Sequence, residues 1–174
     1  MSLNRGFTLL EVLVAVIVLA IGLLGLAKLQ ATGLRANHEA DLRSRATLLA
    51  YDIADRVRAN RIYYVDNEGN LKAPPSADAP GVECVWRNAS TQVDVCTSAQ
   101  MAAYDVYEWS NRAPELLPDG VGVVCLDSTA DDGDPSDYKC DGSGSFYTVK
   151  IWWTEKDDGT GESVTRRYVT TFKP

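Results

Sequence analysis

The sequence predicts an α+β fold in which a long N-terminal helix packs on a C-terminal antiparallel β-sheet with disulfides. Three observations support this prediction. Residues 7–60 contain no proline and change from apolar to amphipathic with a helical period. Residues 146–153 and 163–172 are aromatic and β-branched runs with alternating polarity. All four cysteines lie within residues 84–140.

The N-terminal apolar stretch has the length of a membrane-spanning helix. Residues 7–27 include only Thr8 and Glu11 as clearly polar side chains, and a helix of that length covers about 30 Å, the thickness of a bilayer core. A cleaved secretory signal is the alternative, because Arg5 precedes the apolar run. We expect a transmembrane helix, because the run is longer than the apolar region of such a signal and no small-residue cleavage site follows it.

Glu11 is the anomaly within this stretch. A carboxylate in an apolar membrane helix is costly and by default has a partner, so we expect Glu11 to need a positive group. The alternative is a position close enough to the membrane interface for the side chain to reach water or to stay protonated.

The helix should continue past the membrane to about residue 60 as an amphipathic segment. Side chains at intervals of three or four residues form one stripe, which consists of Leu34, His38, Leu42, Ala46, Leu49, Ile53 and Val57. Such a stripe predicts packing on a folded domain along one side of the helix. We interpret His38, the single histidine, as a packing or boundary residue and not as a ligand.

The middle of the chain predicts shorter elements. A loop rich in proline, glycine and asparagine follows the long helix. Residues 82–86 and 121–126 are short apolar runs that predict strands. Between them, Thr97 or Ser98 can cap a helix that Pro114 is expected to end.

The two C-terminal runs predict an antiparallel hairpin with two distinct faces. One face carries Tyr147, Val149, Ile151 and Trp153, and we expect it to cover the long helix. The other face carries Phe146, Thr148, Lys150 and Trp152. A large aromatic side chain on the outer face of a sheet is either a binding residue or is packed under a loop, and we favour packing for Trp152.

The cysteines predict an oxidising compartment and two disulfides. Four cysteines admit three connectivities, and we expect pairing between sequence neighbours, Cys84 with Cys96 and Cys125 with Cys140. A zinc site is disfavoured, because zinc-binding cysteines usually come in closely spaced pairs and the gaps here are much longer.

The acidic loop between Cys125 and Cys140 is a weak candidate for a hard cation. The candidate ligands are Asp131, Asp132, Asp134 and Asp137. Carboxylate oxygens in a turn with glycine are how calcium is often held, but the complete calcium-loop pattern is missing. We therefore favour a solvated acidic turn and expect no metal and no cofactor.

Charge and composition exclude several classes of function. The chain has 174 residues and a net charge of −7. Residues 1–61 carry eight basic against five acidic side chains, a net of +3, whereas residues 62–174 carry nine against nineteen, a net of −10. The acidic second half argues against nucleic-acid binding. A single histidine removes most metal-dependent and nucleophilic catalytic sites, so we expect no enzymatic activity.

Residues 5–12, with the sequence RGFTLLEV, resemble the processing motif of type IV prepilins and of type II secretion pseudopilins. The resemblance implies that prepilin peptidase cuts after Gly6 and methylates the new N-terminus at Phe7. It also implies that Glu11 pairs with the N-terminal amine of a neighbouring subunit, an attraction that apolar surroundings strengthen.

The same resemblance implies the pilin fold and a division of the chain into three parts. Residues 1–6 would be the cleaved leader, residues 7–30 the transmembrane and filament-core helix, and residues 31–174 the periplasmic head with the second half of the helix. The protein would cross the bacterial inner membrane once and later lie in a pilus at the cell surface.

Residues 21–30, together with 104–109 and 117–123, resemble the PilV group of minor pilins, the type IV pilus modification proteins. This implies a subunit that assembles into, or primes assembly of, a type IV pilus used in adhesion and twitching motility. Implied partners are prepilin peptidase, other minor and major pilins, a tip adhesin and inner-membrane lipid. The alternatives are a minor pseudopilin of a type II secretion system and an adhesive or docking module at the pilus tip.

Overall fold

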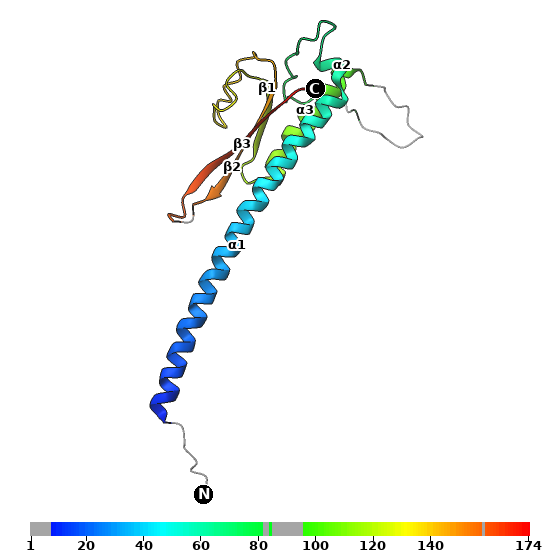
Figure 1. The fold of residues 1–174 in the computed structure, drawn as a ribbon. Helices are drawn as coiled ribbons and strands as arrows, with labels where there is room; N and C mark the ends of the chain where they lie inside the picture. The colour runs from blue at the N-terminus through cyan, green and yellow to red at the C-terminus, as the bar shows by residue number, and fades with distance from the viewer. Residues whose placement is uncertain (1–7, 82–83, 85–95, 158) are drawn as a thin grey trace, which may run out of the picture. The chain divides into compact units, whose positions relative to one another are not determined.

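The computed structural model describes residues 8–81, 84, 96–157 and 159–174. The chain divides into two compact units, Met1–Asp41 and Leu42–Pro174, and helix α1 (Leu9–Ala59) begins in the first and ends in the second (Figure 1). Apart from Cys84, the strand predicted at 82–86 lies outside the described residues.

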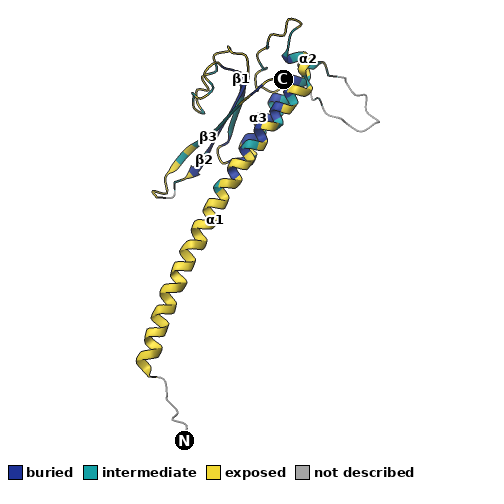
Figure 2. Ribbon diagram, in the orientation of Figure 1, coloured by how far each residue is buried: buried dark blue, intermediate teal, exposed yellow. Residues whose placement is uncertain are grey.

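The first unit, where it is described, consists of the exposed start of α1 (Figure 2). Its large apolar side chains, from Leu9 to Leu34, are each at least 50% exposed. The predicted packing stripe was wrong in this part, because Leu34 is 72% exposed and His38 is also exposed. A helical period shows which side chains share a face, but burial also needs another element to cover that face.

In the second unit, α1 packs along one side. Its buried residues recur at intervals of one, three and four, as expected for one face of a helix, and are Leu42, Ala46, Leu49, Ala50, Ile53, Ala54 and Val57. A short helix, α2 (Arg61–Tyr64), follows at the start of the segment predicted as a loop. Its last residue, Tyr64, is buried and joins the same core.

Helix α3 (Ser98–Leu116) begins with a capping box. The hydroxyl of Thr97 accepts a hydrogen bond from the backbone N–H of Gln100 at 3.3 Å, and the side chain of Gln100 accepts one from the backbone N–H of Thr97 at 2.9 Å. Two N–H groups without helical partners are thereby satisfied, which explains why the helix starts here.

The predicted end of this helix at Pro114 was wrong, because α3 continues to Leu116. Proline removes one amide donor from the last turn. The backbone N–H of Leu117 nevertheless donates to the carbonyl of Ala113 at 3.0 Å, and the Leu117 side chain is only 1% exposed. Packing of Leu117 therefore retains the final turn that proline weakens.

Three antiparallel strands form a sheet in the order β1 (Val121–Leu126), β2 (Tyr147–Lys156), β3 (Ser163–Phe172). The predicted hairpin is confirmed, and its pairing runs from Tyr147 opposite Phe172 to Lys156 opposite Ser163. Because β2 lies between the other two strands, both of its edges are paired. This arrangement confirms the predicted α+β fold of a long apolar helix and a C-terminal antiparallel sheet.

One face of β2 contributes to the core that contains the buried residues of α1 and α3. Tyr147, Val149, Ile151 and Trp153 are all at most 2% exposed. The indole N–H of Trp109, on α3, donates to the carbonyl of Leu49, on α1, at 2.7 Å within this core. This buried hydrogen bond joins the two helices that share the core.

The opposite face of β2 is also buried. Thr148, Lys150 and Trp152 are at most 2% exposed, and the ring of Trp152 stacks on that of Tyr138 with centroids 5.7 Å apart. The prediction that Trp152 packs under a loop is therefore confirmed. That loop follows β1, and a disulfide between Cys125 and Cys140 closes it.

A second disulfide joins Cys84 to Cys96. Both disulfides therefore connect cysteines that are neighbours in the sequence. No free cysteine occurs among the residues that the structure describes.

Candidate functional site

Glu11 lies in the first turn of α1 and is exposed. Its backbone N–H lies 3.1 Å from the carbonyl oxygen of Thr8 and 3.3 Å from the Thr8 hydroxyl, which both accept from it. Threonine followed three residues later by glutamate is the sequence pattern of a capping box. Glu11 is therefore also placed where a carboxylate stabilises the positive end of the helix dipole, a structural role that sequence analysis missed although the pattern was visible.

The surroundings of Glu11 are apolar and exposed. Leu10 is 71% exposed, and Val12 and Leu13 are 53% and 56% exposed. By length and composition α1 can cross a membrane. One stretch of 18 residues in it has a mean hydropathy of 2.9, and none of the residues in that stretch is buried. An apolar surface of this extent indicates contact with lipid or with other protein. Gly6 and Phe7, the predicted cleavage and methylation positions, lie outside the described residues.

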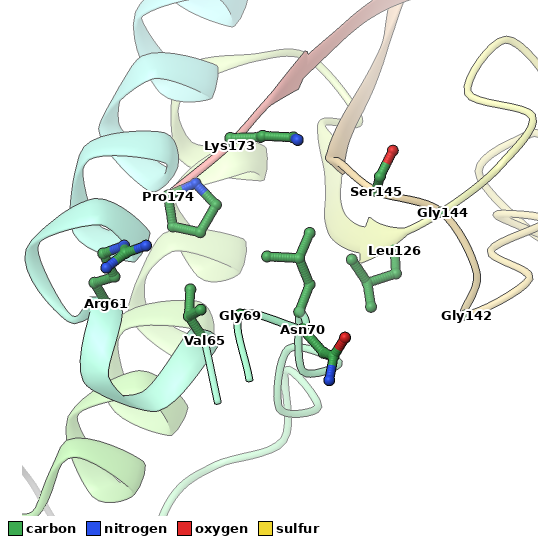
Figure 3. Close-up of a pocket in the computed structure, with 11 residues that line it drawn as sticks. Arg61, Val65, Gly69, Asn70, Leu126, Gly142, Gly144, Ser145, Lys173 and Pro174 are labelled. Carbon is green, nitrogen blue, oxygen red and sulfur yellow. The ribbon is translucent and has the colours of Figure 1, made fainter. Parts of the chain in front are cut away.

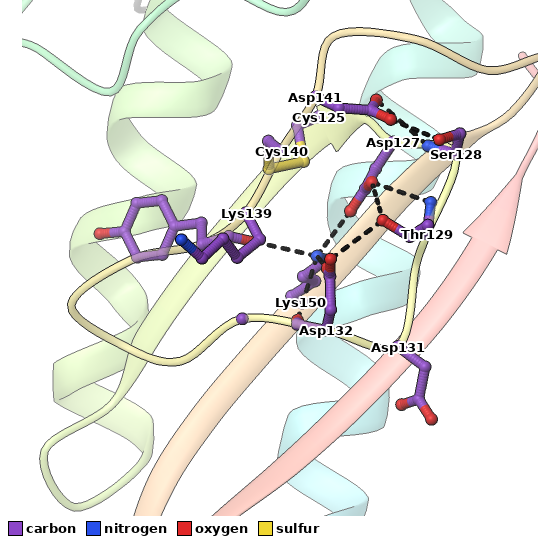
Figure 4. A network of polar contacts seen from close by, with 12 residues as sticks. Cys125, Asp127, Ser128, Thr129, Asp131, Asp132, Lys139, Cys140, Asp141 and Lys150 are labelled. Carbon is purple, nitrogen blue, oxygen red and sulfur yellow. Dashed lines mark hydrogen bonds and ion pairs between the residues drawn. A yellow bond between two sulfur atoms is a disulfide. The ribbon is translucent and has the colours of Figure 1, made fainter.

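A second candidate site is the cluster around Lys150, on the loop-covered face of β2 (Figure 4). The side chains of Lys150 and Asp127 are both 0% exposed, and the ammonium nitrogen lies 2.5 Å from Oδ2 of Asp127. It also donates to Oδ1 of Asp132 at 2.6 Å, to the carbonyl of Tyr138 at 2.9 Å and to the carbonyl of Asp132 at 3.1 Å. One ammonium therefore contacts four oxygens from the two sides of the loop.

Electrostatics favour the charged forms of Lys150 and Asp132. Burial by itself lowers the pKa of Lys150, but its ion pairs with Asp127 and Asp132 outweigh burial and raise the pKa above the usual 10.5. The hydrogen bond from Lys150 lowers the pKa of Asp132 below 3.8. The other oxygen of Asp127 accepts from the backbone N–H of Thr129 at 3.0 Å, which holds the carboxylate in position.

Of the four aspartates proposed as weak cation ligands, only Asp132 reaches this cluster. Asp131 pairs with Arg167 at 2.6 Å, and Asp137 pairs with Lys139. Asp134 accepts from the backbone N–H groups of residues 136 and 137 and shapes its own turn. The structure thus uses these carboxylates separately, as partners of basic side chains and of backbone donors.

Sequence analysis missed Asp127 and Lys150 as partners. The sequence feature that could have indicated a buried ion pair was a lysine between aromatic residues in the most apolar strand of the chain. Oxygen of Asp127 and the sulfurs of Cys125 and Cys140 lie within 4.8 Å of one another. Both sulfurs belong to the disulfide, so neither is a thiolate that can bind a metal.

A pocket of about 480 Å³ lies elsewhere in the second unit (Figure 3). Arg61 and Lys173 contribute positive charge to its lining, and Asn70 and Ser145 contribute neutral polar groups. The residues that line it include no carboxylate, histidine or cysteine side chain. The charged side chains that line this pocket are therefore both basic.

Comparisons with known proteins place the chain in a family. Residues 1–27 match the prokaryotic N-terminal methylation motif, and residues 28–107 match the Tt1218-like family, described as type IV pilin Tt1218. No curated protein and no solved structure matches the chain significantly. The two family matches are adjacent, and the fold they accompany has the long apolar helix, antiparallel sheet and disulfides described above. The two matches together cover residues 1–107, so the chain is a pilus-related type IV pilin with an N-terminal methylation motif.

Proposed function

We propose that the protein is a minor pilin of the PilV type, held in the bacterial inner membrane by α1 and then incorporated into a type IV pilus. The observation that carries this proposal is the exposed carboxylate of Glu11 on an exposed apolar helix, within the residues that match the methylation motif. An apolar helix with one acidic side chain fits assembly with copies of similar helices better than it fits lipid alone.

In this proposal prepilin peptidase cuts after Gly6 and methylates the amine of Phe7. The positive amine of one subunit then neutralises Glu11 of a neighbour in the fibre. Charge pairing in apolar surroundings is stronger than in water, because the effective dielectric constant is lower. The subunit contributes to fibre assembly with other minor and major pilins and performs no chemistry of its own.

The test must separate charge pairing from helix capping, since Glu11 is placed for both. Glu11→Gln keeps a side chain that suits a capping box but removes the charge. Glu11→Asp keeps the charge, and Thr8→Ala removes the capping hydroxyl while leaving Glu11 in place. Each variant replaces the chromosomal copy in the source bacterium, and surface pili are counted by electron microscopy.

We expect Glu11→Gln to be processed and membrane-inserted but to lose most surface pili or its own incorporation into them. Glu11→Asp and Thr8→Ala should retain incorporation. Immunoblots of membrane and sheared-pilus fractions distinguish loss of assembly from loss of the protein. Equal incorporation of Glu11→Gln and the unmodified protein would refute the pairing role and favour capping alone.

A further inference from the structure

The loop over the second face of β2 surrounds the Lys150 ammonium with four oxygens. Two are carboxylate oxygens, from Asp127 and Asp132, and two are backbone carbonyls, from residues 132 and 138. Carboxylate and backbone carbonyl oxygens from one short loop are also the ligands that proteins offer to calcium.

The ammonium does not satisfy all of these oxygens. It has only three N–H donors for four oxygen neighbours, and Oδ2 of Asp127 has no hydrogen bond of acceptable geometry although the ammonium lies 2.5 Å away. The two carboxylates also bring more negative charge than one ammonium neutralises. The cluster therefore has the charge and the oxygens to hold a divalent cation in place of the lysine.

The oxygens are held in place by the fold and do not depend on Lys150 alone. Asp127 directly follows β1, and its second oxygen is bonded to the backbone of Thr129. The disulfide between Cys125 and Cys140 closes the loop, and Trp152 stacks on Tyr138, which contributes one of the carbonyls. Removal of the lysine side chain would leave these supports intact.

We propose that the ammonium of Lys150 is a tethered cation that occupies a latent divalent-cation site in the loop of residues 127–140. The native loop accordingly needs no metal ion. Truncation of Lys150 opens the site to calcium, which completes its coordination of roughly six to eight oxygens with water.

The experiment uses the full chain in detergent, with thermal unfolding followed by circular dichroism in EDTA and in millimolar calcium. The unmodified protein should have the same Tm in both. Lys150→Ala should have a lower Tm in EDTA, and calcium should raise it by several degrees. Lys150→Met should be destabilised with no recovery in calcium, because its side chain still fills the site. Lys156→Ala is the control, because Lys156 lies on the same strand but is exposed. The Tm of this variant should be the same in EDTA and in calcium.

Terbium gives a direct reading of the site, because it replaces calcium and emits when nearby aromatic rings are excited. Trp152 and Tyr138 lie at the loop, so terbium emission should appear with Lys150→Ala and decline as calcium is added. The unmodified chain should show no such emission. A folded Lys150→Ala without a calcium response, or a calcium-dependent Tm of the unmodified protein, would overturn the proposal.

A double variant keeps the test decisive if Lys150→Ala does not fold. Its failure would come from the buried carboxylate of Asp127 left without a cation. Lys150→Met combined with Asp127→Leu removes both charges and should recover much of the lost Tm without a calcium response. If the double variant were no more stable than Lys150→Met alone, Lys150 would not act as the cation for Asp127, and the proposal would fail.

Discussion

Single charged residues in this protein take their roles from the groups around them. Lys150 and Glu11 each stand alone in an apolar sequence segment. Lys150 is 0% exposed with carboxylates and carbonyls around its ammonium, whereas Glu11 is exposed among exposed apolar side chains. A buried charge needs its partners within the chain, because removal of one partner leaves the other charge buried and unpaired and destabilises the fold. An exposed charge on an apolar surface instead indicates a partner from outside.

The pair of Lys150 and Asp132 predicts a dependence of stability on pH. The pKa of Asp132 in the folded protein lies below 3.8 because Lys150 donates a hydrogen bond to it. The pair therefore stabilises the fold above that pH, and its contribution is lost as the pH falls through the folded pKa. We expect the Tm of the full chain in detergent to fall below pH 3.8, and Asp132→Asn to make this fall less steep. Exposed Asp78→Asn is the control, and an unchanged pH profile of Asp132→Asn would contradict the expectation.

At the scale of secondary-structure elements, a few close contacts hold α3 against α1 and β1. Arg56 on α1 lies 3.1 Å from Asp105 and 2.5 Å from Glu108, both on α3. Trp109 of α3 adds its hydrogen bond to α1 and also lies over β1, where Gly122 leaves room for the indole ring. Helix α3 is thus held against both the long helix and the sheet.

Gly122→Ala tests the contact between α3 and β1. A Cβ at this position would lie 2.8 Å from Cη2 of Trp109, closer than carbon atoms can approach. The ring or the strand must move, so we expect a loss of about 1–3 kcal/mol of unfolding free energy. Denaturant unfolding measures this loss, with Gly81→Ala as control because nothing lies within 4 Å of its Cβ position. Equal stability of the two variants would show that the indole ring adjusts without cost.

At the scale of the whole molecule, the buried core and the exposed apolar surface belong to different parts of the chain. Every buried residue of the core lies at or after Leu42. The large apolar side chains from Leu9 to Leu34 are exposed. The described start of α1 therefore presents an exposed apolar surface, and the second part contains the buried core that stabilises the fold.

Removal of residues 1–30 tests this division. We expect a protein that is soluble without detergent and whose Tm lies within about 2 °C of that of the full chain, since none of the described residues that are removed, 8–30, belongs to the core. Removal of residues 1–49 is the contrasting variant, because it also deletes Leu42, Ala46 and Leu49 and should cost at least about 2–5 kcal/mol. Calorimetry and sedimentation provide the measurements. Equal stability of the two truncated proteins would contradict the assignment of the core.

The amino-acid sequence by itself determined the long helix, the capped α3, the strand at 121–126 and the C-terminal hairpin. These features depend on short-range patterns: helical and alternating periods, capping residues and β-branched runs. It also predicted that Trp152 is packed under a loop. The methylation motif is equally local, which is why residues 5–12 were enough to indicate the family.

Only the tertiary structure decided where packing on α1 begins, that α3 continues past Pro114, and that Lys150 is paired with Asp127 and Asp132. Leu34 and Leu42 share one stripe in the sequence, yet only Leu42 is buried. Lys150 meets its partners because β2 lies beside β1 and a disulfide returns the loop over the sheet. Burial and charge pairing depend on contacts between residues far apart in the chain, and local sequence patterns carry no information about those contacts.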